Sequence, residues 1–218
     1  MSREPCQKGT SVLPVVAALK AHPSGRSLVP ASLWKYFDEH MLVSGWYPER
    51  DYFALLEALV KTIDAKAVGG DVWRYFAKFS VQQDISGASA RATGATASHG
   101  KGVYRNFGTS AVGAPEQLFR RAIKLWSQYH DTGTMQITGW RTTTERVVMQ
   151  LVGFAIPMEG FVRLQGYYLE ELGRVVGVAV ESTVTRSTAR GHRYCEWELD
   201  LAPTPASQAY IGTLSIVP

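Results

Sequence analysis

The sequence has few cysteines and no long run of hydrophobic residues. It holds only two cysteines, Cys6 and Cys195, among 218 residues, too few for the disulfide framework of a small secreted domain. No apolar stretch is long enough to cross a membrane, and no charged segment followed by an apolar one opens the chain. We therefore expect a cytoplasmic protein without a membrane span, in which Cys195 is a small buried apolar side chain.

The chain also has little charge. Charged residues make up 19% of it and the net charge is +4, and neither a lysine or arginine run nor a nucleic-acid-binding motif accompanies this small excess. Nucleic acid is therefore not an expected partner. Hydrophobic residues make up 45%, with 6 Trp, 10 Tyr and 8 Phe. This composition is typical of a globular protein, and we expect one domain over residues 1–218 with a large aromatic core.

Helical periodicity dominates the first half of the sequence. Residues 48–64 carry an apolar stripe with the spacing of an amphipathic helix. Asp71 is a predicted N-cap for the next helix, residues 30–41 resemble a further helix start, and Pro115 fits the first position of a helix over 115–130. The first half is therefore predicted to be helical.

Two segments lack such clear patterns. Residues 1–29 are expected to be partly loose, although residues 11–21 are apolar enough to form either a short helix or an extended segment. Residues 86–102 are rich in Ser, Ala, Gly and Thr and are predicted to be a flexible loop.

The second half reads as two strands, a helix and two strands, namely 134–140, 144–154, 157–172, 175–185 and 193–202. The last of these alternates without error. One face carries Cys195, Trp197, Leu199 and Leu201, and the other carries Tyr194, Glu196, Glu198 and Asp200. Because helices precede the strands, the predicted class is α+β, with N-terminal helices followed by an antiparallel sheet packed against helices. A further edge strand is predicted at 210–217.

The order and spacing of several C-terminal motifs resemble a known superfamily. Gly-Tyr-Tyr-Leu at 166–169, Leu-Gly at 172–173, Glu181 on a strand, and Arg-Gly-His-Arg-Tyr-Cys-Glu-Trp-Glu at 190–198 are similar to the end of a 4-vinyl-reductase-type domain. Residues 115–133, with Leu-Trp-Ser-Gln-Tyr-His-Asp-Thr-Gly at 125–133, resemble the helix before the sheet in uncharacterised myxobacterial relatives. The superfamily is related to heme-NO-binding domains and to TRAPP-type tethering subunits. The resemblance implies a sensor-like fold, and because relatives often pair, a homodimer.

The chain departs from that superfamily at its ligand positions. Zinc-binding members use cysteines and a glutamate, and the matching positions beside Cys195 hold Ser187, Val184 and Phe161. A structural zinc ion needs about four ligands. Heme-binding members use an axial histidine and a Tyr-x-Ser-x-Arg motif, and this motif does not occur here. We therefore expect neither a metal nor another cofactor.

The histidines and carboxylates do not form a recognisable catalytic set. His130 and Asp131 close a predicted helix, where a protonated histidine would interact favourably with the helix dipole, and His192 falls in a predicted surface turn. No Ser-His-Asp or Cys-His pairing follows from the spacing. Glu170 and Glu171 are expected on the exposed face of their helix. We therefore expect a protein that is not an enzyme.

Two functions agree with these observations. The first is a non-enzymatic module that acts through protein–protein contacts in signalling or assembly, with the acidic row Glu196, Glu198 and Asp200 as its interaction surface. The alternative is a sensor that binds a small hydrophobic ligand between helix and sheet, a space that the resemblance associates with such ligands. The side chains predicted to converge there, where they either line a ligand site or fill the space as core, are Trp126, Tyr129, Trp140, Tyr167, Tyr168 and Trp197.

Overall fold

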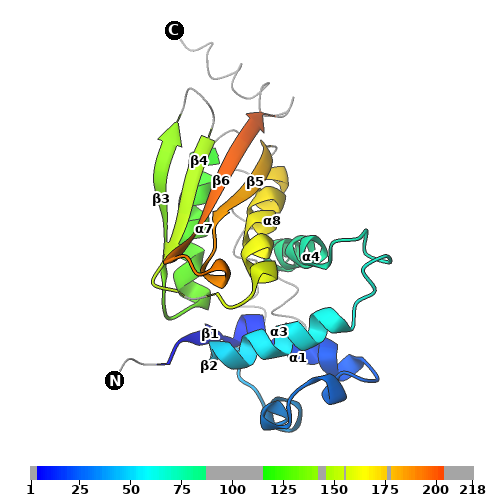
Figure 1. The fold of residues 1–218 in the computed structure, drawn as a ribbon. Helices are drawn as coiled ribbons and strands as arrows, with labels where there is room; N and C mark the ends of the chain where they lie inside the picture. The colour runs from blue at the N-terminus through cyan, green and yellow to red at the C-terminus, as the bar shows by residue number, and fades with distance from the viewer. Residues whose placement is uncertain (1–3, 87–114, 142–145, 155, 176–177, 204–218) are drawn as a thin grey trace.

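The fold is described from a computed structural model, which covers residues 4–86, 115–141, 146–154, 156–175 and 178–203 (Figure 1). The N-terminal part contains, in chain order, β1 (Cys6–Lys8), α1 (Gly9–Ala21), α2 (Lys35–Asp38), β2 (Trp46–Pro48), α3 (Glu49–Lys61) and α4 (Val72–Ser86). The C-terminal part contains α7 (Pro115–Tyr129), β3 (Thr134–Arg141), β4 (Arg146–Val152), α8 (Glu159–Val175), β5 (Val178–Arg186) and β6 (Tyr194–Pro203). Short 3-10 helices form at Arg26–Leu28, Ala31–Leu33 and Thr188–Arg190.

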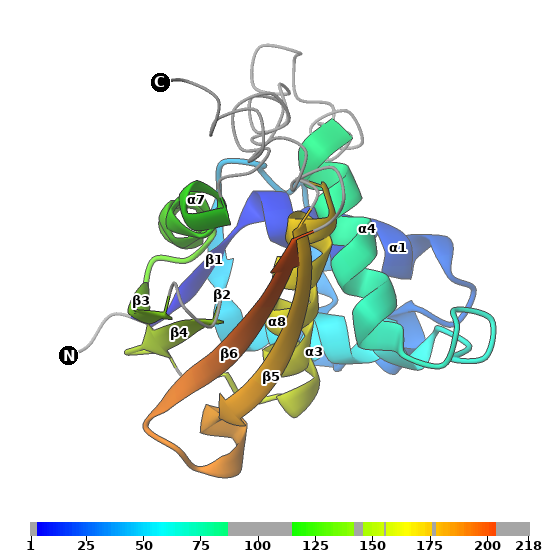
Figure 2. The ribbon, with the colours of Figure 1, turned by 90° about the horizontal axis from the view of Figure 1, so that it is seen from above.

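The C-terminal strands form one antiparallel sheet in the order β3-β4-β6-β5. The last strand, β6, lies inside the sheet and pairs with both β4 and β5. Helices α7 and α8 lie on the same side of the sheet (Figures 1 and 2), and no described element covers its other side. The predicted α+β class, with a strand-strand-helix-strand-strand unit, is confirmed.

The alternation predicted for 193–202 is confirmed and explains why the sheet has one buried face. Cys195, Trp197 and Leu199 are fully buried. Trp197 lies opposite Met149 of β4 and Val184 of β5, and its indole N–H donates to the carbonyl oxygen of Val162 on α8 at 2.9 Å. The most deeply buried aromatic side chain of the sheet therefore also fixes α8 against it.

Within the N-terminal part, α1, α2 and α3 form a layer with the two-stranded sheet of β1 and β2, whereas α4 packs against α8 (Figures 1 and 2). Part of the segment 1–29, expected to be loose, forms β1 and α1, which settles the alternative left open for 11–21 in favour of a helix. Since α1 begins at Gly9, Pro14 lies in its second turn. The helix predicted from residues 30–41 is shorter than expected, because only Lys35–Asp38 is α-helical.

Other N-terminal predictions agree with the structure. Asp71 caps α4, because its Oδ1 accepts hydrogen bonds from the backbone N–H groups of Trp73 and Arg74 at 3.0 and 3.3 Å. Within the described residues, no helix is both long and apolar enough to cross a membrane. Apart from Ser86, the predicted loop 86–102 lies outside the described residues, as does the predicted strand 210–217.

The turn after α7 depends on a glycine. Gly133 has a φ of +76°, and a Cβ added to it would lie 2.6 Å from the Cβ of Phe154. Gly69 has a comparable φ of +85° with open space around it. The two positions therefore share the backbone requirement and differ only in packing.

We predict that Gly133→Ala destabilises the protein more than Gly69→Ala. Both pay about 1–2 kcal/mol for a left-handed alanine, and Gly133→Ala adds about 1–3 kcal/mol for overpacking against Phe154. Urea unfolding of the two variants measures the difference. Equal losses would contradict the close approach between Gly133 and Phe154.

Candidate functional site

The six aromatic side chains predicted to line a ligand pocket come from four elements. Trp126 and Trp197 are buried and the other four are half-buried. Trp126 and Tyr129 lie on α7, Trp140 on β3, Tyr167 and Tyr168 on α8, and Trp197 on β6.

These six side chains make contacts in different places. Trp140 contacts Phe119 of α7, with ring centroids 6.3 Å apart. Tyr167 instead faces α4: its hydroxyl donates to Asp71 at 2.9 Å, and the Arg74 guanidinium lies 4.1 Å above its ring. The seam between α7 and β3 is therefore the part of the predicted pocket that has aromatic contacts from both a helix and the sheet.

The most elaborate cluster lies where α7 ends. The ring of His130 stacks on Trp126 of the preceding turn, with centroids 3.7 Å apart and planes 5° from parallel. Phe154 meets both rings edge-on, at 5.0 and 5.1 Å. The Trp126 indole N–H donates to the carbonyl oxygen of Thr132 at 3.0 Å. His130 is therefore held in one orientation by aromatic contacts on two sides.

His130 is paired with a carboxyl group from the N-terminal part. Its Nδ1 lies 3.0 Å from Oε1 of Glu49, at the start of α3, and both side chains are less than 10% exposed. Burial raises the pKa of Glu49 to about 8, with the nearby Asp131 as a smaller cause, and lowers the pKa of His130 to about 3. The expectation of a protonated His130 at this helix end is therefore wrong. The free energy lost by removing an imidazolium from water exceeds the favourable interaction of its charge with the helix dipole.

Strand β1 also contacts the end of α7, and we call the region formed by Glu49, His130, Asp131 and β1 the junction. The backbone N–H of Cys6 donates to Oδ1 of Asp131 at 2.6 Å, and the Asp131 N–H donates to the Cys6 carbonyl oxygen at 3.2 Å. Gln7 and His130 form an isolated antiparallel bridge. Because residues paired in this way place their side chains on the same side, the buried Gln7 side chain lies next to the imidazole.

Two polar atoms of this region, Oε1 of Gln7 and Oγ1 of Thr132, are buried without a hydrogen-bond partner. Such atoms are rare in native proteins and usually contact an internal water molecule or another small polar group. The junction therefore has unused hydrogen-bonding capacity as well as a buried acid and a buried base.

Sequence reasoning singled out His130 but missed its partner. Glu49 is 81 residues away, and a glutamate in the first turn of an amphipathic helix is ordinarily exposed. The expectation that Glu170 and Glu171 lie on the solvent-exposed face of their helix is also wrong, because they are only 7% and 6% exposed. Glu170 accepts from the backbone N–H and hydroxyl of Ser182 and from Arg74, so its charge is fully used in joining α8 to β5 and α4.

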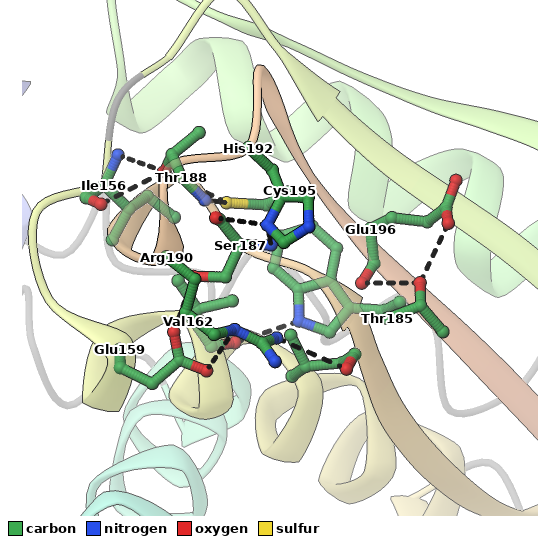
Figure 3. A network of polar contacts seen from close by, with 12 residues as sticks. Ile156, Glu159, Val162, Thr185, Ser187, Thr188, Arg190, His192, Cys195 and Glu196 are labelled. Carbon is green, nitrogen blue, oxygen red and sulfur yellow. Dashed lines mark hydrogen bonds and ion pairs between the residues drawn. The ribbon is translucent and has the colours of Figure 1, made fainter.

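The surroundings of Cys195 form a second polar network (Figure 3). Its Sγ lies 3.4 Å from the backbone nitrogen and 3.3 Å from the hydroxyl of Thr188. That hydroxyl also accepts from the N–H of Ile156 at 2.9 Å and lies 3.1 Å from its carbonyl oxygen. Ser187 donates to Glu159 at 2.5 Å, and Glu159 pairs with Arg190 at 3.3 Å.

This network does not have the composition of a metal site. Ser187 supplies a hydroxyl where the zinc-binding pattern has a cysteine. Val184, at the position of the glutamate, pairs with Trp197 in the sheet, and Phe161, at the position of another cysteine, packs edge-on against Phe53 at 5.1 Å. Among the described residues, no group of three or more His, Cys, Asp and Glu side chains could hold a metal ion. The site is held by hydrogen bonds instead.

The acidic row of β6 lies on the uncovered side of the sheet but is already paired. Arg146 contacts Asp200 at 2.6 Å and Glu198 at 3.2 Å. Glu196 accepts from Gln150 at 2.6 Å and from Thr185 at 2.8 Å. A hollow of about 290 Å³ is lined by Thr138, Gly139, Arg146, Val148 and Glu198. This surface is therefore polar and largely charge-balanced.

Comparison with known proteins shows similarity of structure only. No family model matches the sequence, and no curated protein matches it. The Fe(II) unliganded H-NOX protein from K. algicida matches with a TM-score of 0.54 at 12% identity, over 91% of this chain and 98% of that one. A mutant H-NOX protein from S. oneidensis in the Fe(II) ligation state matches with a TM-score of 0.51 at 16% identity, also over 91% and 98%.

A trafficking protein particle complex subunit 3 from Naegleria fowleri, covalently bound to palmitic acid, matches over 71% of this chain and 93% of its own, at 13% identity with a TM-score of 0.38. The H-NOX proteins therefore share the fold of this chain, in agreement with the heme-NO-binding resemblance at the level of architecture.

That resemblance implies a heme held by a histidine, and the described residues do not fit one. Of the histidines that the structure describes, His130 alone is buried. Its ring is stacked on Trp126, bordered by Phe154 and bonded to Glu49. A porphyrin bound to this imidazole would have to displace these neighbours, and packed interiors do not open without a large cost.

We predict that Thr188→Val destabilises the protein by about 1–3 kcal/mol, because it leaves the buried N–H of Ile156 without an acceptor. Thr183→Val, at an exposed position of β5, is the matched control and should change stability by less than about 0.5 kcal/mol. Urea unfolding distinguishes them. Similar values for both would show that the Thr188 hydroxyl does not hold the Cys195 network together.

Proposed function

We propose that this chain is a sensor-like, non-enzymatic module that binds a small hydrophobic ligand rather than heme. The observation that carries the proposal is the fold, shared over nine-tenths of the chain with H-NOX proteins described in Fe(II) states, together with an imidazole that is already occupied by its own neighbours. The chain thus combines the architecture of the H-NOX proteins with an interior that, over the residues that the structure describes, does not suit a porphyrin.

The ligand site that we propose is the seam between α7 and β3. Phe119 is buried, whereas Ile123, one turn along α7, and Ile137 and Trp140 of β3 are only partly buried against the core. These side chains are apolar and lie on facing surfaces of a helix and the sheet, which is the usual composition of a small-molecule site. Trp126 and Tyr129 continue the same helix toward the His130 cluster.

An enzymatic role has less support. His22 lies at the end of α1, and His40 and His192 are exposed, while His130 is bonded to Glu49 and covered by aromatic rings. A catalytic base needs access to a substrate proton. Within the described residues, no histidine combines such access with an activating partner.

A second candidate function, an adaptor acting through protein contacts, is favoured by one observation. The outer side of the sheet carries Glu196, Glu198 and Asp200 and a 39% exposed Val152, and no described element covers it (Figure 1). A protein partner or a second copy of the chain would bind there. The resemblance to 4-vinyl-reductase-type domains and to myxobacterial proteins stays a prediction, and it agrees with either function.

Native mass spectrometry of the protein purified from its own host tests the first proposal. We predict a non-covalent small-molecule adduct that Trp140→Ala reduces at least tenfold and that Tyr75→Ala, an exposed aromatic position on α4, leaves unchanged. Added hemin should give no stoichiometric Soret band. A stoichiometric Soret band would overturn the proposal, and a bare chain that co-purifies with another protein would favour the adaptor.

A further inference from the structure

The Glu49–His130 pair connects the two layers of the fold. Glu49 starts α3 in the N-terminal part, its N–H donates to the Pro5 carbonyl oxygen at 2.9 Å, and its carboxyl lies 3.0 Å from His130 at the end of α7. The β1 contacts with Asp131 and His130 lie beside it. Any change in the charge of this pair therefore acts on the attachment of the N-terminal part to α7.

The surroundings of the pair disfavour charge. His130 is covered by Trp126 and Phe154, and Tyr52 of α3 is 8% exposed close to Glu49. The charged neighbours are occupied elsewhere or repel an anion. Arg50 pairs with Glu4 at 2.9 Å, Lys8 lies 4.4 Å above Trp46, and Asp131 adds a negative group.

The remaining neighbours do not supply a compensating charge either. On β1, the Cys6 thiol donates to the Glu4 carbonyl oxygen at 3.4 Å, and on α3, Asp51 accepts from Tyr36 at 2.6 Å and pairs with Lys35 at 3.3 Å. A buried carboxylate next to Asp131 would thus be poorly compensated, and a buried imidazolium would lose its hydration.

We infer that Glu49 and His130 share one proton, carried by the Glu49 carboxyl and donated to Nδ1 of His130, and that its loss in the alkaline range loosens the attachment of the N-terminal part to α7. The junction is then a pH-sensitive contact built into the fold. It requires no ligand, so it goes beyond the proposed function and stands independently of it.

The sign of the pH dependence follows from counting protons in the folded and unfolded chains. The ordinary pKa values are 4.5 for the glutamate and 6.5 for the histidine, and the folded values are about 8 and about 3. Between pH 4.5 and 6.5 both states hold one proton, on His130 when unfolded and on Glu49 when folded, so the pair contributes no slope.

Outside that window the two states differ. Above pH 6.5 the unfolded chain loses its proton while the folded chain keeps it up to about pH 8, so the folding equilibrium constant falls by up to about tenfold per pH unit. Below pH 4.5 the unfolded chain gains a second proton and stability falls as the pH drops toward 3. The pair alone therefore produces a plateau at mildly acidic pH and an alkaline decline.

The test is urea unfolding of wild type and Glu49→Gln at pH 6 and pH 8.5. Glutamine has the shape of the protonated carboxyl and can donate an N–H to Nδ1, but it cannot ionise. We predict that the wild-type folding equilibrium constant falls more than tenfold between these pH values and that the variant loses this decline. Glu57→Gln, on the exposed face of α3 beside Lys61, is the matched control and should keep the wild-type profile.

Two further measurements keep the inference falsifiable. Hydrogen exchange at pH 8.5 should be at least tenfold faster for the Cys6 amide in wild type than in Glu49→Gln, because the β1 contact is loosened locally. Nitrogen-15 NMR of wild type should show a neutral His130 with an unprotonated Nδ1 at pH 6, even if the variant does not fold. A cationic His130 at pH 6, or an unchanged alkaline decline in Glu49→Gln, would overturn the inference.

Discussion

The contact between the N-terminal layer and α7 depends on how the His130 imidazole is buried at the end of that helix without carrying a charge. A helix end carries unsatisfied carbonyl groups, and here it is followed by an imidazole and a carboxylate, both turned toward the N-terminal layer. The backbone of β1 satisfies Asp131, the stacked Trp126 and Phe154 cover His130, and Glu49 supplies a neutral hydrogen-bond partner. A neutral Glu49–His130 pair would therefore contribute to this contact together with the apolar side chains around it.

The packing around His130 shows why sharing a fold with H-NOX proteins does not imply binding the same ligand. The chain has the fold of H-NOX proteins, yet its buried imidazole is stacked and hydrogen-bonded within the chain. A fold supports many functions because the functional groups are added to it. Around Cys195, too, the local side chains differ from those that a metal would need. The hydroxyls of Ser187 and Thr188 make hydrogen bonds that hold the turn.

Local patterns could be predicted from the sequence where the local chain determines the outcome. The alternation in 193–202 placed Cys195 and Trp197 on the buried face, and Asp71 was identified as a cap from its position before an apolar helix. The roles of Glu49 and Glu170 could not be predicted, because their partners are distant in the sequence. The partner of Glu49 is 81 residues away, and the two partners of Glu170 are 12 and 96 residues away. Helical periodicity assigns a glutamate to the exposed face, and only the tertiary contacts show that another element covers it.

Helix α7 is the element through which a ligand and the shared proton would influence each other. One stretch of it, from Phe119 to Ile123, faces β3, and its last turn carries Trp126 and leads directly into His130. A ligand seated against Trp140 that shifts α7 along β3 would alter the stacking on which the buried pair depends. The ligand would then change the proton affinity of the pair by some factor. By thermodynamic reciprocity, deprotonation of the pair would change the affinity for the ligand by that same factor. Coupling of this kind requires two discrete packings of α7, so a ligand whose affinity does not vary between pH 6 and pH 8.5 would mean that the seam and the junction act as independent sites.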